Sequence, residues 1–527
     1  MPDFLTLKEA SSFASEYLKR NVTISNISYL VQYGKVKKIG DNGSTVIDKN
    51  ELIKYYDSLY QNREFSWKDK LGNDLNWHLS FSNLTETETT KHVHRLHPYK
   101  GKFIPQLVEY FLDEHIDDYK KNIYFHKGDI VLDPFCGSGT TLVQASESGL
   151  HSVGIDVSAF NAFIGNSKIG KYNLNDLTLT IKGITQQLKE YIDQFEGNIT
   201  NFDKELTEEL YKFNNIYFAV PDYKYKVNRR EIDEYEYGNK YAKDFLKIYN
   251  QLISKYHIVL TQDKQDNFLD KWYLKNIREE VNFVFSLVKQ INNISEKKIS
   301  GLILSRTVRS CRATTHSDLA TLKSPMISPY YCQKHGKICK PLFSIFSWWQ
   351  RYGLDTLERL AVFDKLRKNT FQCCLTGDSR TVDIYKELDE RNPLFANLVK
   401  NQKIKGIFSS PPYVGLIDYH EQHAYVYDLF GFKRQDNLEI GPLFSGQGEV
   451  ARKSYVEGIS NVLINCQKYL VPDYDIFLVA NDKYNLYPLI AEKTGMKIVE
   501  QFKRPVLNRT ERDKGAYSEI IFHFKAK

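Results

Sequence analysis

A turn containing two glycines, with an acid on the strand that follows it, is the first feature that could do chemistry. The residues IVLDPFCGSGTTLVQASESGLHSVGID, at positions 130–156, predict a buried strand, a tight turn, a helix and a second strand. The turn contains Gly137 and Gly139, and glycine lets a backbone approach a ligand closely. Asp156 ends the second strand, where a carboxylate can accept both ribose hydroxyls of an adenosine. The pattern indicates a site for an adenosine-containing ligand.

Two common phosphate-binding patterns are incomplete in this turn. The dinucleotide fingerprint requires a third glycine, and Leu142 occupies that position. The other phosphate loop requires a lysine after its last glycine, and Thr140 stands there instead. The turn therefore has the place of a nucleotide-binding loop without either set of phosphate-binding residues.

A second candidate stretch, GIFSSPPYVG at positions 406–415, places a hydroxyl and two prolines after an apolar run. The run KGIFSS predicts a sheet strand, and α/β sheets bind their ligands at the carboxyl ends of strands. Because proline fixes φ, the Ser410 Oγ and the backbone carbonyl oxygen of Pro411 would be held in place as hydrogen-bond acceptors. Taken alone, the string is as compatible with a purely structural role, a strand end followed by a stiff turn, as with a functional one.

Together, DPFCGSGTT and SPPY resemble the cofactor and catalytic motifs of S-adenosylmethionine-dependent DNA amino-methyltransferases. The resemblance covers roughly residues 92–171 and 371–525, with the cofactor motif first, although many members carry the two halves in the opposite order. It implies that S-adenosylmethionine is the cofactor, that Asp133 holds its methionine amino end and that Phe135 packs beside it. The cofactor-binding residues expected from the turn and the resemblance are Lys102, Phe103, Asp133, Pro134, Phe135, Gly137, Gly139, Thr140, Asp156 and Asp378.

The resemblance also implies what the second motif does. The target of this family is an exocyclic amine of a base, whose nitrogen lone pair is delocalised into the ring. Acceptors aimed at its two N–H bonds make that nitrogen more nucleophilic, and an aromatic ring can stack on the base after it leaves the helix. The catalytic residues expected on this basis are Ser410, Pro411, Pro412 and Tyr413.

The residue before Pro-Pro-Tyr separates two subclasses of the family. Members with Asp or Asn there mostly modify adenine N6, and members with Ser mostly modify cytosine N4, so Ser410 favours cytosine N4. We therefore expect a site-specific cytosine-N4 DNA methyltransferase, acting by base flipping on double-stranded DNA beside a restriction endonuclease. Adenine N6 and RNA guanine are alternative targets. A DNA-binding regulator with an inactive methyltransferase fold is the alternative from another class.

The elements that must position these residues form two α/β segments. Residues 92–171 supply the cofactor half, residues 371–527 supply the catalytic half, and residues 172–370 form a long insertion suited to target recognition. We expect an α/β fold, a Rossmann-like class I methyltransferase sheet interrupted by a largely helical insertion. Residues 58–91 are polar and predict a linker.

The first 57 residues predict a small separate domain. Thr6-Leu-Lys-Glu9 is a capping box that opens a helix, a second helix ends at Gly34, a basic hairpin turns at Asn42-Gly43, and a third helix follows Asp48. This order resembles the winged helix-turn-helix of excisionase-like DNA-binding domains, and a small helical packing module is the alternative. The DNA contacts that the resemblance implies are Thr23, Ser25, Asn26, Lys35, Lys37 and Lys38.

Cysteines and histidines gather near the end of the insertion. Cys332-x2-His335-x3-Cys339 has a spacing compatible with zinc, with Cys311 or His316 as a fourth ligand. The spacing fits no zinc-finger pattern, so we expect no metal and interpret the segment as a tight loop with buried thiols.

Charge and composition are those of an ordinary globular protein with a mildly basic balance. The 527 residues carry a net charge of +7, which is compatible with a polyanionic partner, and Arg306, Arg309 and Arg312 recur every third residue as candidate DNA contacts or a solvated face. Seven cysteines do not make a disulfide framework in a chain of this length. We see no signal peptide or membrane span and expect a cytoplasmic monomer.

Overall fold

The computed structural model describes residues 4–18, 21–39, 45–72, 74–81, 83–99, 101–316, 324–341, 344–417, 420–506 and 516–527. The chain divides into two compact units. The first contains Met1–Gly72, Leu188–Glu280 and Ser310–Ser344, and the second contains Asn73–Gln187, Val281–Arg309 and Ile345–Lys527. The turn expected at Asn42-Gly43 lies outside the described residues. No helix in the described ranges combines the length and the apolar character needed to cross a membrane.

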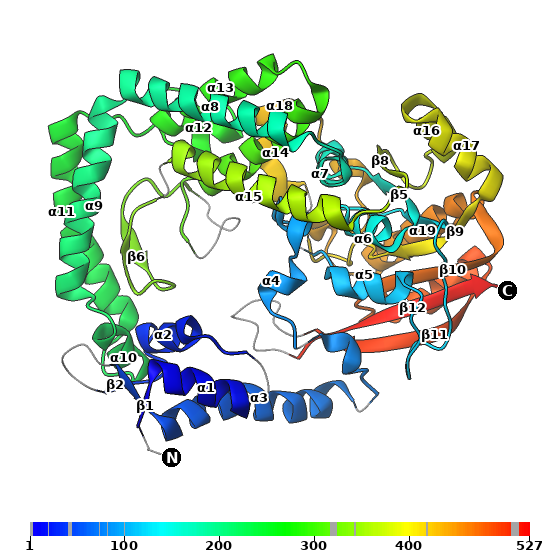
Figure 1. The fold of residues 1–527 in the computed structure, drawn as a ribbon, viewed down its shortest axis with the longest axis horizontal. Helices are drawn as coiled ribbons and strands as arrows, with labels where there is room; N and C mark the ends of the chain where they lie inside the picture. Colours follow the sequence, from blue (N-terminus) through cyan, green and yellow to red (C-terminus); the bar gives the residue numbers. More distant parts are fainter. Residues whose placement is uncertain are drawn as a thin grey trace. The chain divides into compact units, whose positions relative to one another are not determined.

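The second unit is built on a seven-stranded sheet with the order β11-β12-β10-β9-β4-β5-β8 (Figure 1). Five neighbouring strands, from β10 to β8, are parallel, and β12 runs antiparallel to both β10 and β11. This confirms the expected α/β class. The strands are β4 (Ile130–Asp133), β5 (His151–Asp156), β8 (Gln372–Thr376), β9 (Ile404–Ser409), β10 (Leu470–Ala480), β11 (Met496–Pro505) and β12 (Ser518–Ala526).

Strand β4 is the point at which the strand order reverses. Leu132 of β4 is in register with Val153 of β5 on one side and with Ile407 of β9 on the other. The chain continues from β4 outward to β5 and β8, and it later returns to fill β9 and β10 on the opposite side. Crevices at the carboxyl ends of strands beside such a reversal are where open α/β sheets bind ligands.

Helices cover both faces of this sheet, because the strands are apolar on both faces. Side chains alternate along a strand, so Ile130 and Leu132 pack with one core cluster and Val131 with the other. The first cluster contains residues of α16, α17, α19 and α20, and the second contains residues of α5. The helices of this unit are α4 (Glu86–Thr89), α5 (Pro105–Leu112), α6 (Thr140–Ser148), α7 (Ala159–Ile169), α15 (Ile345–Leu366), α16 (Ile384–Arg391), α17 (Pro393–Gln402), α18 (Ala424–Phe430), α19 (Glu449–Gln467) and α20 (Tyr487–Thr494).

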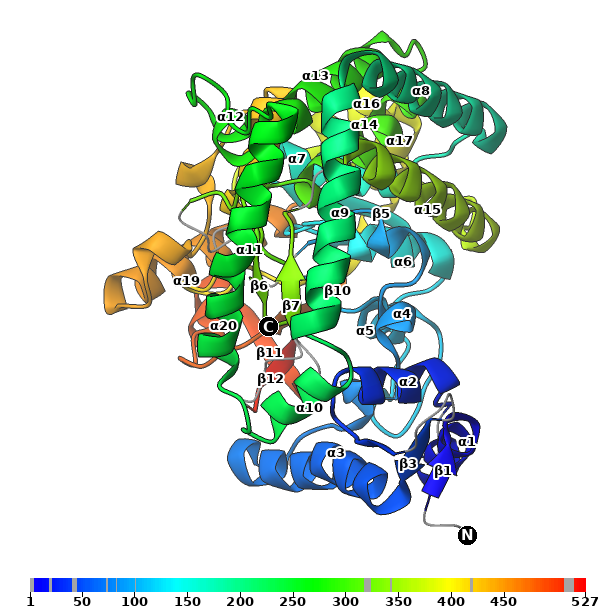
Figure 2. The same ribbon diagram turned by 90° about the vertical axis from the view of Figure 1, so that its left-hand side faces the viewer.

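The insertion is largely helical, as the sequence predicts. Three of its helices span or end at a boundary between the two units: α8 (Leu174–Phe195), α13 (Lys275–Gln290) and α14 (Ile294–Ser310). Within the first unit the insertion contributes α9 (Gly197–Tyr217), α10 (Asp222–Asn228), α11 (Glu234–Tyr256) and α12 (Phe268–Trp272). The long helices α9 and α11 lie side by side, with the hairpin of β6 (Tyr330–Cys332) and β7 (Lys337–Cys339) against them (Figure 2).

The N-terminal part of the first unit contains the expected order of elements. Strand β1 (Phe4–Thr6) is followed by α1 (Leu7–Tyr17), α2 (Ile24–Gln32), β2 (Lys38–Ile39), β3 (Val46–Asp48) and α3 (Lys49–Leu71). Capping boxes at Thr6 and Thr23 open the first two helices. Helix α3 continues well beyond residue 57, so the N-terminal element that was expected to end there is longer and much of the expected linker is helical.

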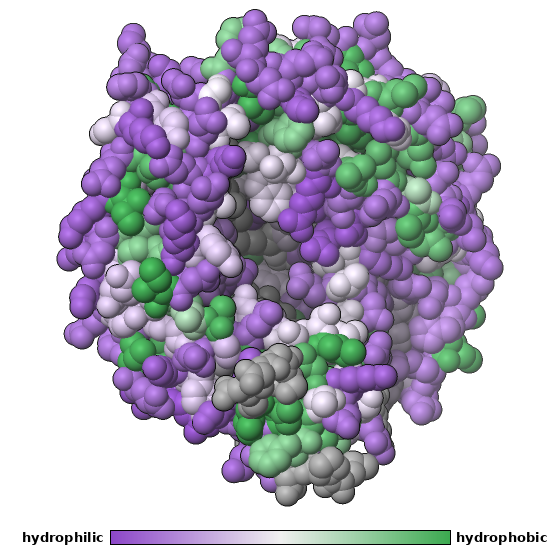
Figure 3. Space-filling model, turned by 60° about the vertical axis from the view of Figure 1, so that its left-hand side comes forward, coloured by the Kyte–Doolittle hydropathy of each residue, from purple (hydrophilic) through white to green (hydrophobic). Residues whose placement is uncertain are grey.

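The surface in Figure 3 is mostly hydrophilic, with small and scattered hydrophobic patches. Exposed aromatic and aliphatic side chains occur singly on the long helices of the first unit, as at Tyr211, Ile216 and Tyr235. Isolated exposed apolar residues are normal on a folded protein and need no partner.

Candidate active site

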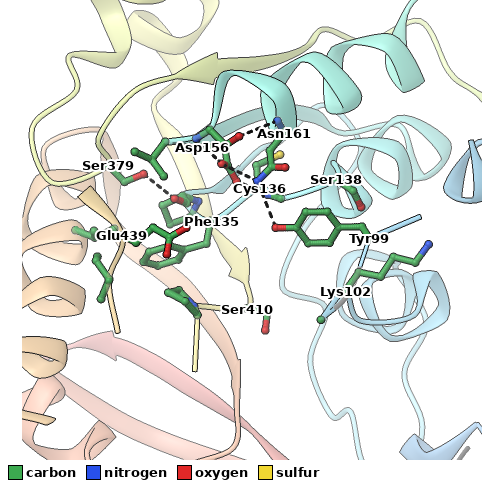
Figure 4. A pocket seen from close by; sticks show the side chains of 18 of the residues that line it. Tyr99, Lys102, Phe135, Cys136, Ser138, Asp156, Asn161, Ser379, Ser410 and Glu439 are labelled. Atoms are coloured by element: carbon green, nitrogen blue, oxygen red, sulfur yellow. Dashed lines mark hydrogen bonds between the residues drawn. The ribbon is translucent and has the colours of Figure 1, made fainter. Parts of the chain in front are cut away.

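A cavity opens in the second unit at the carboxyl ends of β4, β5, β8 and β9, beside the strand-order reversal (Figure 4). The structure brings both sequence motifs to it. The predicted residues that line the cavity are Lys102, Phe103, Pro134, Phe135, Gly137, Thr140, Asp156, Asp378, Ser410 and Pro412.

The two positions in the turn require glycine for different structural reasons. Gly137 has a φ of +51°, and a Cβ there would lie 3.1 Å from the ring of Tyr99. Gly139 has a φ of +78° and is the N-cap of α6, and a Cβ there would lie 2.9 Å from the Cα of Gly165 on α7. Gly137 therefore keeps the turn close to Tyr99 at the cavity wall, while Gly139 lets two helices approach each other behind it.

Asp156 is held at the cavity wall by its neighbours. One carboxylate oxygen accepts hydrogen bonds from the Ser158 backbone N–H (2.8 Å) and from Asn161 Nδ2 (3.1 Å), and the other accepts from the Gly137 N–H (2.8 Å). Burial raises the pKa of Asp156 to about 6, because these three bonds only partly replace the lost water. Each carboxylate oxygen can accept more than one hydrogen bond, so capacity remains for ligand hydroxyls.

Asp133 occupies a different place from the one expected. It is 1% exposed and lies outside the cavity lining, where its Oδ1 accepts from Ser409 Oγ (2.5 Å) and from the Phe135 N–H (3.2 Å). Burial raises the pKa of this carboxyl to about 6. In this structure Asp133 links the ends of β4 and β9, and so it positions the turn from behind.

Asp378 reaches the cavity from the end of β8. Its carboxylate is paired with Arg380, with Nη2 at 2.8 Å and Nε at 2.9 Å from carboxylate oxygens. The next residue, Ser379, donates a hydrogen bond to the Pro134 carbonyl (2.6 Å) and so joins β8 to the glycine turn. The structure therefore places Asp378, as predicted, in the cavity lining, just beyond the end of a third strand.

Lys102 and Phe103 approach from the segment before α5. Lys102 Nζ donates to the His94 carbonyl oxygen (2.8 Å), and burial lowers its pKa to about 8. The ring of Phe103 meets the ring of Phe408 edge-on, with centroids 5.5 Å apart. Both residues line the cavity, but Lys102 is tied to the protein through its ammonium group.

Ser410 is oriented by the next strand of the sheet. Its Oγ donates a hydrogen bond to the backbone carbonyl oxygen of Val479 in β10, at 3.1 Å. A hydroxyl has one hydrogen to donate and two lone pairs to accept with. With the hydrogen committed to Val479, the Ser410 oxygen is left as an acceptor at the cavity wall.

Pro411 and Tyr413 are not in the lining of this cavity. Pro411 is buried, and Tyr413 lines a neighbouring cavity of the same unit together with Asn481 and Tyr517. The Tyr413 hydroxyl donates to a carboxylate oxygen of Glu519 (2.9 Å), and burial, together with this carboxylate, raises the pKa of the phenol. The SPPY turn therefore stands between two cavities, with Ser410 in one wall and Tyr413 in the other.

Several further lining residues belong to neither motif, and among them are Tyr99, Asn161, His420 and Glu439. Asn161 could have been found, because Ser158 is the N-cap of α7 and Asn161 stands three residues later, with its amide donating to Asp156. The Tyr99, His420 and Glu439 segments are irregular, so no periodicity marks them. The His420 N–H donates to Glu439 (3.1 Å), which joins the two segments.

The N-terminal residues expected to contact DNA are exposed, which is compatible with that prediction but does not test it. These residues are Thr23, Ser25, Asn26, Lys35, Lys37 and Lys38. Three of them already have partners inside the first unit. Asn26 shares a capping box with Thr23, and Lys37 Nζ lies 5.3 Å from the centre of the Tyr225 ring.

The three arginines of the insertion do not form a common solvated face. Arg306 is 7% exposed, forms an ion pair with Asp355, and stacks over the Tyr352 ring at 3.9 Å. Arg309 is half-buried, and Arg312 lies over the Trp272 ring at 3.8 Å. The expectation of a DNA-contacting row is wrong for Arg306, because its guanidinium is buried against partners of its own unit.

The charges around the cavity suit a ligand without phosphates. Among the described residues, its lining contains the carboxyl groups of Asp156, Asp378 and Glu439, and Lys102 is the one lysine or arginine. A pyrophosphate site would need cationic groups and free backbone N–H groups, but the Gly137 N–H is already bonded to Asp156. An adenosine that carries a cationic sulfonium, as S-adenosylmethionine does, fits this lining better than a dinucleotide.

Comparison with known proteins agrees with this geometry. A family model described as DNA methylase matches residues 8–166. The chain is 47% identical over 526 residues to the Type II methyltransferase M.MjaII of Methanocaldococcus jannaschii, covering 99% of this chain and 96% of that protein. It is 25% identical over 312 residues to the Type II methyltransferase M.BsoBI of Geobacillus stearothermophilus, covering 55% of this chain and 57% of that one. A 136-residue match at 32% identity to the Type II methyltransferase M.MvaI of Kocuria varians covers 25% and 28%.

The first of these similarities extends over nearly the whole of both chains, so it includes both motifs and the insertion between them. S-adenosylmethionine is accordingly the methyl donor. The chain belongs to the Type II methyltransferases, DNA amino-methyltransferases of the restriction-modification type.

Proposed function

We propose that this enzyme methylates N4 of a flipped cytosine at a specific site in double-stranded DNA. The observation that carries the proposal is the Ser410 hydroxyl, which donates to Val479 and so presents lone pairs to the cavity. An exocyclic amine has two N–H bonds and needs acceptors for both. The Ser410 Oγ accepts one and the Pro411 carbonyl oxygen accepts the other, with the prolines fixing the backbone between them.

These acceptors matter most at the moment of transfer. The bound cofactor supplies an electrophilic methyl group. Two acceptors on the N–H bonds favour the tetrahedral geometry of the amine, and they stabilise the positive charge that develops on its nitrogen. The proton can leave to solvent afterwards, so the chain does not need a strong base at this position.

Other residues of the chain position the two reactants. Asp156 and Asp378 hold the adenosine end of the cofactor at the wall of the first cavity. Tyr413, in the wall of the second cavity, stacks on the flipped base, and stacking of this kind contributes about 1–3 kcal/mol per base. Positioning of this kind makes a large contribution to in-line transfer.

The DNA itself would be bound through other surfaces. The exposed polar residues at the start of α2 are proposed to face bases, and Lys35 and Lys38 to contact phosphates. We also propose that the methyl mark protects the target site from a restriction endonuclease. DNA from cells that express the enzyme would then resist cleavage at that site.

Adenine N6 is the second candidate target, because a serine acceptor is not chemically restricted to cytosine. The decisive experiment incubates the purified enzyme with S-adenosylmethionine and mixed-sequence duplex DNA, digests the DNA to nucleosides and identifies methylated species by mass spectrometry. N4-methyldeoxycytidine supports the proposal. N6-methyldeoxyadenosine refutes the choice of base, and cofactor binding without any methylated nucleoside would favour the regulator.

A further inference from the structure

Four side chains that bind soft metals converge around the β6–β7 hairpin of the first unit. His316, Cys332, His335 and Cys339 each offer one ligand atom, and these atoms all lie within 4.8 Å of one another. Zinc bond lengths of about 2.0–2.3 Å place tetrahedral ligand atoms about 3.3–3.8 Å apart, so only a small contraction is needed. We propose that these four residues bind a structural zinc ion.

The hairpin provides the backbone for such a site. The N–H groups of His335 and Gly336 both donate to the Cys332 carbonyl oxygen, at 3.1 and 2.7 Å, and Gly336 has a φ of +61°. This tight turn returns the chain so that His335 Nδ1 lies 3.4 Å from Cys339 Sγ. Two strands joined by a turn thus bring three ligands together within eight residues of the sequence.

The fourth ligand is oriented by a tyrosine of the same hairpin. The Tyr330 hydroxyl oxygen accepts from the His316 backbone N–H (2.7 Å) and lies 2.8 Å from His316 Nδ1. When Nδ1 carries the hydrogen and donates it to Tyr330, Nε2 keeps its lone pair for the metal. Hydrogen bonding of the second ring nitrogen is the usual way in which a protein fixes a metal-binding histidine.

The alternative fourth ligand that the sequence offered is excluded by its position. Cys311 Sγ donates to the Ser344 carbonyl oxygen (3.4 Å) and is not a member of the cluster. The expectation of a loop with buried thiols and no metal rested on a spacing that fits no zinc-finger pattern. The convergence of His316, Cys332, His335 and Cys339 instead gives two thiols and two imidazoles, a donor set typical of structural zinc and unlike the oxygen ligands of magnesium sites.

Another group among the described residues, His92, His94 and Glu147, meets the same distance limit. Its carboxylate already has a cationic partner, because Lys91 Nζ lies 2.8 Å from Glu147. His94 Nε2 is also hydrogen-bonded to Gln144 (2.9 Å). That group is an ion-pair network, whereas the cluster at the hairpin has no lysine or arginine among its hydrogen-bonded partners in the described residues.

Zinc at this position would fasten the segment that contains His316 to the hairpin. The hairpin is anchored on the long helices, since Ile338 exchanges two backbone hydrogen bonds with the Asn214 side chain of α9 (both 2.9 Å). Tyr331 donates to Glu234 of α11 (2.7 Å). His316 already contacts the hairpin through Tyr330, and the metal would add a bonded link to the three ligands of the hairpin. The ion therefore acts as a cross-link within the first unit.

The test measures metal on the intact protein, purified without a metal-affinity step from zinc-supplemented cultures. We expect one zinc ion per chain by mass spectrometry of the elements. Replacing zinc with cobalt should give visible d–d bands and near-ultraviolet thiolate-to-cobalt bands. Cys332→Ser should lose the metal, while Cys311→Ser, which changes a buried thiol outside the cluster, should keep it.

Three results would overturn the proposal. They are protein without zinc, zinc that persists in a variant with both Cys332→Ser and Cys339→Ser, and a disulfide between these cysteines in native protein. If the serine variants fail to fold, the metal content and the cobalt spectrum of the unaltered protein still decide. None of these readouts depends on methyl transfer. The zinc proposal can therefore be refuted while the proposed function stands, and the proposed function can be refuted while the zinc proposal stands.

Discussion

Replacing Ser410 with alanine isolates the role of one oxygen. The Ser410 hydroxyl donates a hydrogen bond to the Val479 carbonyl, and because the prolines fix the backbone we expect its removal to leave the polypeptide path of the SPPY turn unchanged. The loss of one neutral hydrogen bond lowers the free energy of unfolding by about 1 kcal/mol. Cofactor binding is expected to be nearly unchanged, because the contacts proposed for the ribose and the adenine come from Asp156 and Asp378 and not from Ser410.

The chemical step should be affected far more than the fold. Removing one preorganised partner from a developing charge costs about 2.7–4 kcal/mol, which slows the step by about 100- to 1000-fold. The Pro411 carbonyl remains as the second acceptor, so we expect residual activity rather than none. Single-turnover transfer of a labelled methyl group is the right assay, since it separates chemistry from product release.

Ser409→Ala is the matched control, because it removes the neighbouring hydroxyl from the same strand end. Ser409 Oγ donates to buried Asp133, away from the cavity lining. This variant is expected to change thermal stability and cofactor affinity more than the single-turnover rate at saturating cofactor. If Ser410→Ala transfers methyl within about fivefold of the parent rate, an effect far below that of one preorganised acceptor, the assignment of Ser410 is wrong.

Three further predictions concern the pocket, the turn and the base. Burial raises the pKa of Asp156 to about 6, and bound ribose hydroxyls would stabilise its ionised form, so the cofactor should bind best when this carboxyl is ionised. Cofactor affinity measured by calorimetry should therefore fall about tenfold from pH 7.5 to 5. An affinity that does not change with pH would contradict this. Gly139→Ala should lower the free energy of unfolding by more than about 1–2 kcal/mol, the cost of left-handed strain alone, because the new Cβ would meet the Cα of Gly165. Gly431→Ala is the control, because Gly431 has a similar φ but open space around its Cβ position. Equal shifts of the melting temperature in the two variants would disprove the contact. Tyr413→Phe keeps the ring and should methylate DNA nearly as well as the parent. Tyr413→Ala removes the ring and should lose the fluorescence signal of base flipping that a 2-aminopurine at the target position reports. An undiminished signal would exclude stacking by Tyr413.

The glycine turn and its flanking strands could be predicted from sequence because their signals are local. The N-cap at Gly139 and the helix end at Gly149 are separated by one helix, and both have the left-handed φ that favours glycine. The same holds for the capping boxes at Thr6 and Thr23. Helix α3 was missed beyond residue 57 because KYYDSLYQNREFSWKDKL shows no clear apolar periodicity.

The partners of the site residues could not be predicted, because they come from distant parts of the chain. Asp133 was expected at the ligand, but its partner Ser409 stands 276 residues later. Tyr413 pairs with Glu519, 106 residues away, and Arg306 with Asp355. Residue type and spacing identify which groups can do chemistry, while long-range pairing decides which of them face the ligand and which are buried as supports.

The hydrogen bond between Ser409 and Asp133 also bears on how the protein is made. Strand β4 is the central neighbour of β9, yet the ribosome must add 276 residues after Asp133 before Ser409 exists. At about 5–20 residues per second this delay is roughly 14–55 s. The β4–β5 pair lacks β8 until residue 372 is added and lacks β9 until residue 404 is added, and until then its apolar faces and unpaired edges are open to other chains. Slower growth and added chaperones during expression should therefore raise the soluble yield of the intact protein. They should raise the yield less for a polypeptide of the catalytic half alone, whose strands follow one another without the long insertion.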